Sequence, residues 1–143
     1  KIKIGAYTRC AYESQFVDSN FHFVLNMKTG NVTRRESEIL IGKCNWIGNR
    51  TSITKGSKTK DFSIICAGSL MNKDYTQNEE NFIMLGGSPA KVLTSGLKRI
   101  FSTEIEKDII YFFNNNPKAN NYNLTSELSD DFKDIHYWFE HMM

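Results

Sequence analysis

The stretch that decides the fold consists of five six-residue units: IGKCNW (41–46), IGNRTS (47–52), ITKGSK (53–58), TKDFSI (59–64) and ICAGSL (65–70). The first position is isoleucine in four of the five units and threonine in the other. The fifth position is always asparagine, threonine or serine. An amphipathic helix requires a period of about 3.6 residues and a half-buried strand a period of about two, so neither explains this repeat.

A six-residue unit suits one short flat strand followed by a tight corner. Three such units close a triangular coil of about eighteen residues, as in hexapeptide β-helices. The leading aliphatic side chain points into this prism, and the small polar residue lies near the corner, where a large side chain does not fit. Glycine and asparagine tolerate positive φ at the corners, so the chain needs only its two prolines.

The same phase extends towards the N-terminus through Ile4, Cys10, Phe16 and His22. The step from His22 to Ile41 breaks the phase, and we interpret the polar residues 26–38 as a loop ejected from the coil.

The C-terminal part of the chain departs from the repeat, which stops after Asp74. Residues 82–92 indicate a short strand and a glycine turn, and the tail is helical from about Ser102. Thr103 and Glu106 form a capping box, and Ser129 can cap a second helix. We therefore expect a β-helix domain over residues 1–93 and a helical extension over residues 94–143.

Composition excludes several classes of protein. The chain has 143 residues and a formal net charge of +2, so it lacks the basic footprint of a nucleic-acid-binding protein. No apolar stretch reaches the roughly 18 residues of a membrane span. Three cysteines without a CxxC spacing argue against a disulfide framework or a cysteine-rich zinc site, and they suit the cytoplasm. Because the chain begins at Lys1 and not at methionine, we expect further coils to precede it.

Three motifs resemble those of a known protein family: IGKCNWIGN (41–49), ICAGSLMNKD (65–74) and GGSPAKV (86–92). Their order and spacing resemble the signatures of hexapeptide-repeat acyltransferases, and most closely those of the CoA-dependent O-acetyltransferases that modify sugars. The resemblance implies a left-handed parallel β-helix, and the handedness rests on it alone. It also implies a homotrimer with acetyl-CoA bound between subunits, and no metal.

Acyl transfer requires a base that takes a proton from the acceptor, and histidine suits this role near neutral pH. His136 and His141 lie in the tail, whereas His22 lies directly before the ejected loop, where the resemblance places the catalytic histidine. It implies direct attack on the thioester in a ternary complex, with Asp18 and Asn20 orienting His22 or binding sugar hydroxyls. The alternative is that His22 only fills an inward position of the coil.

The resemblance also implies the cofactor-binding residues. Ala67, Gly68 and Ser69 match the segment whose main chain contacts the pantetheine arm of CoA. Trp46 matches a tryptophan that walls the active site, with Asn49 beside it. The positions matched near the nucleotide end are Asn72, Lys73 and Lys91. The alternative for each lysine is a solvated surface charge, and Cys66 departs from the pattern by replacing a glycine.

Three functions remain open at this point. The first is an O-acetyltransferase acting on a sugar, and the second is an N-acyltransferase acting on an amino sugar, which would use the same His22. The third is a non-catalytic β-helix used for binding or assembly. A zinc enzyme on this fold requires three converging histidines, whereas only His22 lies in or beside the repeat.

Overall fold

The computed structural model of the chain describes residues 1–124. It divides into two compact units, of which the first comprises Lys1–Arg99 and the second begins at Ile100. The described residues are mostly β structure with one helix. None of the described helices is long and apolar enough to cross a membrane.

Short strands occupy most of the first unit. They are β1 (Ile2–Ile4), β2 (Arg9–Cys10), β3 (Gln15–Val17), β4 (Val24–Leu25), β5 (Val32–Thr33), β6 (Ile39–Ile41), β7 (Trp46–Ile47), β8 (Ser52–Thr54), β9 (Ile64–Ile65), β10 (Leu70–Met71), β11 (Met84–Gly87) and β12 (Ala90–Thr94). The second unit contains α1 (Thr103–Asn115).

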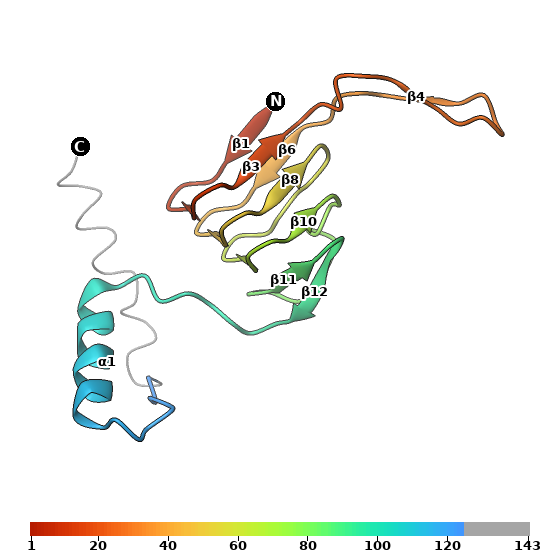
Figure 1. The fold of residues 1–143 in the computed structure, drawn as a ribbon. Coiled ribbons are helices and arrows are strands. Elements are labelled where there is room, and N and C mark those ends of the chain that lie inside the picture. The colour runs from red at the N-terminus through yellow and green to blue at the C-terminus, as the bar shows by residue number, and fades with distance from the viewer. Residues whose placement is uncertain (125–143) are drawn as a thin grey trace, which may run out of the picture. The chain divides into compact units, whose positions relative to one another are not determined.

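Three parallel ladders build the first unit, and successive rungs of a ladder lie side by side (Figure 1). The first face pairs β1 with β6 and continues through bridges at Lys58 and Asp74. The second face runs β2, β7, β9, β11, and the third runs β3, β8, β10. Ile47 pairs with Ile65 and Ile53 with Met71, so the rungs recur every eighteen residues as the hexapeptide period predicts.

The leading residues of the hexapeptide units form one core between the three faces. The five leading residues and Met71, the next residue in the same phase, are all buried, with relative exposures of 5% or less: Ile41, Ile47, Ile53, Thr59, Ile65 and Met71. Because the aliphatic members come from all three faces and join a single cluster, the prediction that they point into a common interior is confirmed. Burying an isoleucine side chain contributes about 1.5–3 kcal/mol, so these stacked side chains supply much of the free energy that stabilises the fold.

The small polar residues of the fifth position donate hydrogen bonds to backbone carbonyl oxygens within the corners. The hydroxyl of Ser63 donates to the carbonyl oxygen of Lys60 at 2.8 Å, and that of Ser69 donates to Cys66 at 2.6 Å. In both corners the hydroxyl group thus bonds the carbonyl oxygen three residues earlier, within a tight turn. The glycine after the leading isoleucine is required for another reason. A Cβ on Gly48 would lie 2.5 Å from the backbone nitrogen of Ala67 in the next turn.

The corners differ from the sequence prediction in which residues adopt positive φ. The first corner (residues 5–8, 42–45, 60–63 and 81–82) places Tyr7, Cys44, Phe62 and Phe82 in this region, and the second corner (residues 11–14, 48–51 and 66–69) places Glu13, Arg50 and Gly68 there. The expectation that glycine and asparagine would occupy these positions is therefore mostly wrong. Glu13, Arg50 and Phe82 are exposed, whereas Cys44 is buried. Backbone hydrogen bonds between successive turns, such as that from the N–H of Phe62 to the carbonyl oxygen of Lys43, hold the corners.

The ejected loop begins earlier than residues 26–38. Phe16 pairs with Ile53, a separation of 37 residues where an uninterrupted coil has eighteen, so about one further turn's length of chain is inserted after Phe16. An antiparallel bridge joins Ser19 to Glu36, and β4 pairs antiparallel with β5. This hairpin projects from the third corner (residues 18–38, 55–57 and 72–73), as Figure 1 shows.

The placement of His22 in the repeat phase is therefore wrong, because the chain leaves the coil before reaching it. The six-residue spacing from Phe16 to His22 continues only in the sequence, since the coil resumes after the insertion with β6, where Ile41 pairs with Ile4 of the first face.

The C-terminal end of the ladders is closed by an antiparallel pair, β11 and β12. The buried Tyr75 donates a hydrogen bond from its hydroxyl to the carbonyl oxygen of Ala90 at 2.9 Å, and burial raises the pKa of this tyrosine. In the second unit, α1 is capped by Ser102, which accepts from the N–H of Ile105, and not by Thr103. The second helix predicted from Ser129 lies outside the described residues.

Candidate active site

His22 lies on the projecting hairpin, just before β4. Its backbone N–H donates to the carbonyl oxygen of Asn20 at 2.7 Å, and the intervening Phe21 has φ of 63°. This is a γ-turn with positive φ, a rare and strained conformation for a residue with a side chain. The side chain of His22 is exposed, so the alternative that it fills an inward position of the coil is wrong.

Arg35, on the returning half of the hairpin, contacts both neighbours of His22. Its Nη1 donates to the carbonyl oxygen of Phe21 at 3.1 Å, and its Cζ lies 4.6 Å from the ring centroid of Phe23. Its Nη2 also lies 3.2 Å from Oε1 of Glu36. The sequence prediction missed Arg35, because its pairing with residues 21–23 becomes visible only once the hairpin register is known.

Asp18 and Asn20 lie at the root of the hairpin. Asp18 accepts from the backbone N–H of Ser37 through its carbonyl oxygen at 3.1 Å. Within residues 1–124, no hydrogen bond joins the side chain of Asp18 or Asn20 to the His22 imidazole, so the three are near in sequence but not joined.

Asn72 and Lys73 lie at the same third corner as the hairpin, two turns away from its root. Both side chains are exposed, and the carbonyl oxygen of Lys73 accepts from the N–H of Lys58 at 3.1 Å. Lys55, in the turn between, donates from its Nζ to the carbonyl oxygen of Arg34 at 2.5 Å and so ties the hairpin to this corner.

The residues predicted to contact the pantetheine arm lie at the second corner. The N–H of Gly68 donates to the carbonyl oxygen of Asn49 at 2.9 Å, which stacks the two turns. Ala67 and Gly68 are exposed, whereas Ser69 is buried. The corner thus presents a strip of backbone with almost no side chain over it, which is what a close-fitting linear ligand needs.

Trp46 lies on the second face, and Lys91 lies on β12, which pairs with that face. Trp46 begins β7 directly after the first corner and exposes 44% of its surface, and the Cζ of Arg99 lies 5.6 Å from its ring. Lys91 is exposed on β12 and pairs with Gly86. Both residues therefore belong to the face that leads to the column of Asn49, Ala67 and Gly68.

The predicted site residues thus fall into two groups at different corners. The third corner carries His22, Asp18 and Asn20 together with Asn72 and Lys73. The second corner carries four of the eight predicted CoA contacts: Asn49, Ala67, Gly68 and Ser69. The third face separates the two corners, and its three-residue strand β8 measures about 10 Å at 3.3 Å per residue.

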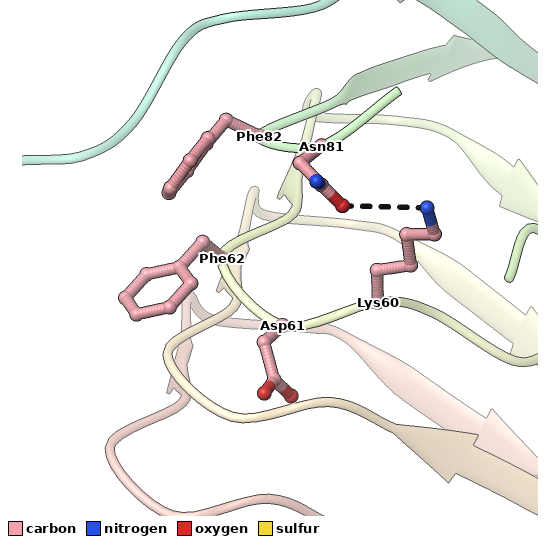
Figure 2. Close-up of a pocket in the computed structure, with 5 residues that line it drawn as sticks. All are labelled: Lys60, Asp61, Phe62, Asn81 and Phe82. Carbon is pink, nitrogen blue, oxygen red and sulfur yellow. Dashed lines mark hydrogen bonds between the residues drawn. The ribbon is translucent and has the colours of Figure 1, made fainter. Parts of the chain in front are cut away.

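A pocket of about 360 Å³ opens at the first corner, and none of the predicted residues lines it. Figure 2 shows Phe62 and Phe82 on one side of it, with Lys60, Asp61 and Asn81 on the other. The two rings lie 5.4 Å apart between centroids, and Lys60 donates from its Nζ to the side-chain oxygen of Asn81 at 3.4 Å. Aromatic faces beside amide, ammonium and carboxylate groups can bind a small polar molecule that has an apolar face.

The residues described contain no group of three or more histidine, cysteine, aspartate or glutamate side chains that could hold a metal ion. No disulfide joins the three cysteines, all of which lie in the described residues: Cys10 is exposed, Cys44 is buried at the first corner, and Cys66 is half-buried.

Comparison with known proteins finds similarity in structure and not in sequence. No protein-family model matches the chain, and no curated protein matches it in sequence. Its fold is similar to that of the polysialic acid O-acetyltransferase OatWY, at 22% identity and a TM-score of 0.60, over 78% of this chain and 54% of that one.

Two further solved structures are similar. Galactoside acetyltransferase in complex with coenzyme A has 24% identity and a TM-score of 0.51, over 66% of this chain and 44% of that one. A hexapeptide-repeat acetyltransferase from Vibrio cholerae O1 biovar eltor, complexed with acetyl coenzyme A, has 23% identity and a TM-score of 0.50, over 66% and 49%.

The structural neighbours are therefore hexapeptide-repeat acetyltransferases, and the resemblance read from the three motifs is confirmed at the level of the fold. The chain spans about half the length of each of these neighbours.

Proposed function

We propose that this chain belongs to an acetyltransferase that moves an acetyl group from acetyl-CoA to a hydroxyl group of a sugar. The observation that carries the proposal is the placement of His22, exposed on a hairpin that projects from a fold shared with sugar O-acetyltransferases. The protein would then be an enzyme, and acetyl-CoA its acyl donor, as it is the ligand of a neighbour.

The ladders of this fold would wind as a left-handed β-helix. Parallel pairing every eighteen residues around a single core supports a β-helix. Left-handed winding rests on the resemblance of the three motifs and not on the period, since connections between parallel strands are right-handed in nearly all proteins.

In the proposed mechanism, the imidazole of His22 accepts the proton of the sugar hydroxyl as the oxygen attacks the thioester carbonyl carbon. The carbonyl oxygen becomes an oxyanion, and a backbone N–H stabilises it, a contribution of about 3–4 kcal/mol in well-studied acyl transfer. The tetrahedral intermediate collapses, the C–S bond breaks, and the thiolate leaves with a proton returned from His22. Asp18 and Asn20, at the hairpin root, would bind other hydroxyl groups of the sugar.

The second corner would hold the CoA arm. Ala67 and Gly68 are exposed and small, so an extended pantetheine chain can lie against their backbone. Ser69 and Asn49 shape this edge, and Trp46 walls it. The exposed ammonium group of Lys91 suits the phosphates at the nucleotide end. Asn72 and Lys73 lie at the other corner, so they would serve the CoA of a neighbouring chain.

A homotrimer with the site between subunits would bring the two groups of residues close together. Within one chain the third face separates the base from the CoA corner, whereas in a trimer the hairpin of one chain can reach the second corner of the next. The hairpin also exposes apolar side chains that a partner would cover. They are Phe21, Phe23, Val24, Leu25, Met27 and Val32. Three cysteines without a CxxC spacing favour the cytoplasm as the location.

Two other functions are distinguished by simple measurements. An N-acyltransferase would use the same His22 and would acetylate amino sugars in preference to neutral sugars. A non-catalytic β-helix would neither bind CoA nor consume acetyl-CoA.

The experiment that tests the proposed function measures acetyl-CoA consumption by the purified protein against a panel of neutral sugars, acidic saccharides and amino sugars. We expect turnover with a hydroxyl acceptor and a thermal shift with CoA alone. Acetylation confined to amine acceptors would replace the first function by the second. The absence of both turnover and a CoA shift would reject the acetyltransferase proposal.

A further inference from the structure

The backbone immediately before His22 is strained. Seven residues other than glycine have positive φ in the described part of the chain, and six of them lie in the stacked first and second corners. Phe21 is the exception, because it lies on the exposed hairpin, where no adjacent rung holds it. A γ-turn at positive φ persists only when its surroundings fix it, and such strain is concentrated at functional sites.

Arg35 supplies that restraint. Its guanidinium donates to the carbonyl oxygen of Phe21, the strained residue itself, and lies over the ring of Phe23 on the other side of His22. The main chain of Arg35 contributes as well, since its carbonyl oxygen accepts from the N–H of Asn20 at 3.0 Å. The residues on both sides of His22 are thus held by one side chain.

Holding the Arg35 guanidinium in this orientation leaves one of its donors without a hydrogen bond in the described part of the chain. Its Nε is buried and has no hydrogen-bond partner among the described residues, which is unfavourable for folding. Its Nη2 is anchored by Glu36 at 3.2 Å. A lysine cannot make these contacts together, because its single ammonium group lacks the planar fork that reaches a carbonyl oxygen, a carboxylate and a ring face at once.

We propose that Arg35 is a positioning residue for His22: through Phe21 and Phe23 it fixes the direction in which the imidazole faces the acceptor hydroxyl. This inference rests on the proposed role of His22 as the base. Because Arg35 lies on the hairpin and the CoA arm is assigned to the second corner, its loss should lower kcat and leave the KM for acetyl-CoA unchanged. Misplacing a base by about 1 Å can cost about 100-fold in rate.

The test compares four variants, Arg35→Ala, Arg35→Lys, Arg34→Ala and His22→Ala, by steady-state kinetics and thermal unfolding. Arg34 is the matched control, because it is the adjacent residue with the same charge, and only its backbone carbonyl takes part in a hydrogen bond within residues 1–124. Free guanidinium ion, at concentrations far below those that unfold the protein, is added to Arg35→Ala as a rescue.

We expect Arg35→Ala to lose about 100-fold in kcat with an unchanged KM for acetyl-CoA, guanidinium to restore part of the loss, and Arg35→Lys to remain impaired. Arg34→Ala should behave as the wild type.

Two results overturn the inference while the proposed function stands, provided that His22→Ala is inactive. One is a kcat of Arg35→Ala within about twofold of that of Arg34→Ala. The other is a loss that guanidinium does not reverse and that follows a lowered melting temperature, which would make Arg35 a structural residue only. If His22→Ala itself keeps wild-type turnover, the proposed base is wrong, and the inference about Arg35 is rejected with it.

Discussion

The side-chain amide of Asn45 donates a hydrogen bond to the carbonyl oxygen of Lys60, which belongs to the next turn of the ladders, at 2.9 Å. The same amide donates to the carbonyl oxygen of Lys43, and its oxygen accepts from the hydroxyl of Thr59 at 2.8 Å. Asn45 is fully buried, so these bonds form away from solvent and join two turns at the first corner.

We expect Asn45→Ala to lower the free energy of unfolding by about 3 kcal/mol, because three hydrogen bonds of about 1 kcal/mol each are lost. Denaturant unfolding measures this loss, with Asn31→Ala, on the exposed hairpin, as the control. A loss no larger than that of the control would show that the amide does not tie the turns together.

Two glycines of the second corner should respond differently to alanine. Gly48→Ala places a Cβ 2.5 Å from the backbone nitrogen of Ala67, so we expect a loss of about 3 kcal/mol. Gly68→Ala meets no atom within 4 Å but has φ of 70°, so the expected loss is about 1 kcal/mol from backbone strain. Chemical denaturation of both variants checks the order, and equal losses would contradict the close approach of the turns.

Binding of CoA at the second corner is tested by filling the corner. Ala67→Phe places a large side chain on the exposed strip, so we expect calorimetric titration to show at least about a tenfold weaker affinity, a difference of about 1.4 kcal/mol. Glu79→Phe, at another exposed position, is the control and should bind CoA as the wild type does. Unchanged affinity of Ala67→Phe would place the CoA arm elsewhere.

Assembly through the hairpin is tested by adding charge to its apolar surface. Leu25 and Val32 pair across the hairpin and are about half exposed. We expect the double variant Leu25→Glu, Val32→Glu to be a folded monomer in analytical ultracentrifugation, because burying two unpaired carboxylates is unfavourable. A trimer that persists in this variant would exclude the hairpin from the subunit interface.

The interior of the fold could be predicted from the sequence because each hexapeptide unit repeats one physical requirement. An isoleucine such as Ile47 must stack on Ile65, and the glycine after it must admit the backbone of the next turn. These constraints act at fixed separations along the chain. The start of the insertion could not be predicted, because residues 18–22 continue the spacing although the chain has already left the coil.

The candidate site could be predicted only in part, for the same reason. His22 and Ala67 are predicted from their place in local motifs, and their roles stay predictions. Arg35 is not predicted, since its contacts with Phe21 and Phe23 depend on the antiparallel register of the hairpin. The separation of the proposed base from the corner proposed to bind CoA likewise follows from the width of the third face, which a linear motif does not contain.

The central claim is that His22 is the base of an acetyl transfer, and one measurement tests it most directly. Single-turnover transfer from acetyl-CoA to the best acceptor is compared between the wild type and His22→Ala, with Lys28→Ala at the hairpin tip as a matched surface variant. The account predicts that His22→Ala binds CoA and unfolds at the wild-type temperature but loses transfer by at least about 100-fold. Wild-type transfer by His22→Ala would contradict it.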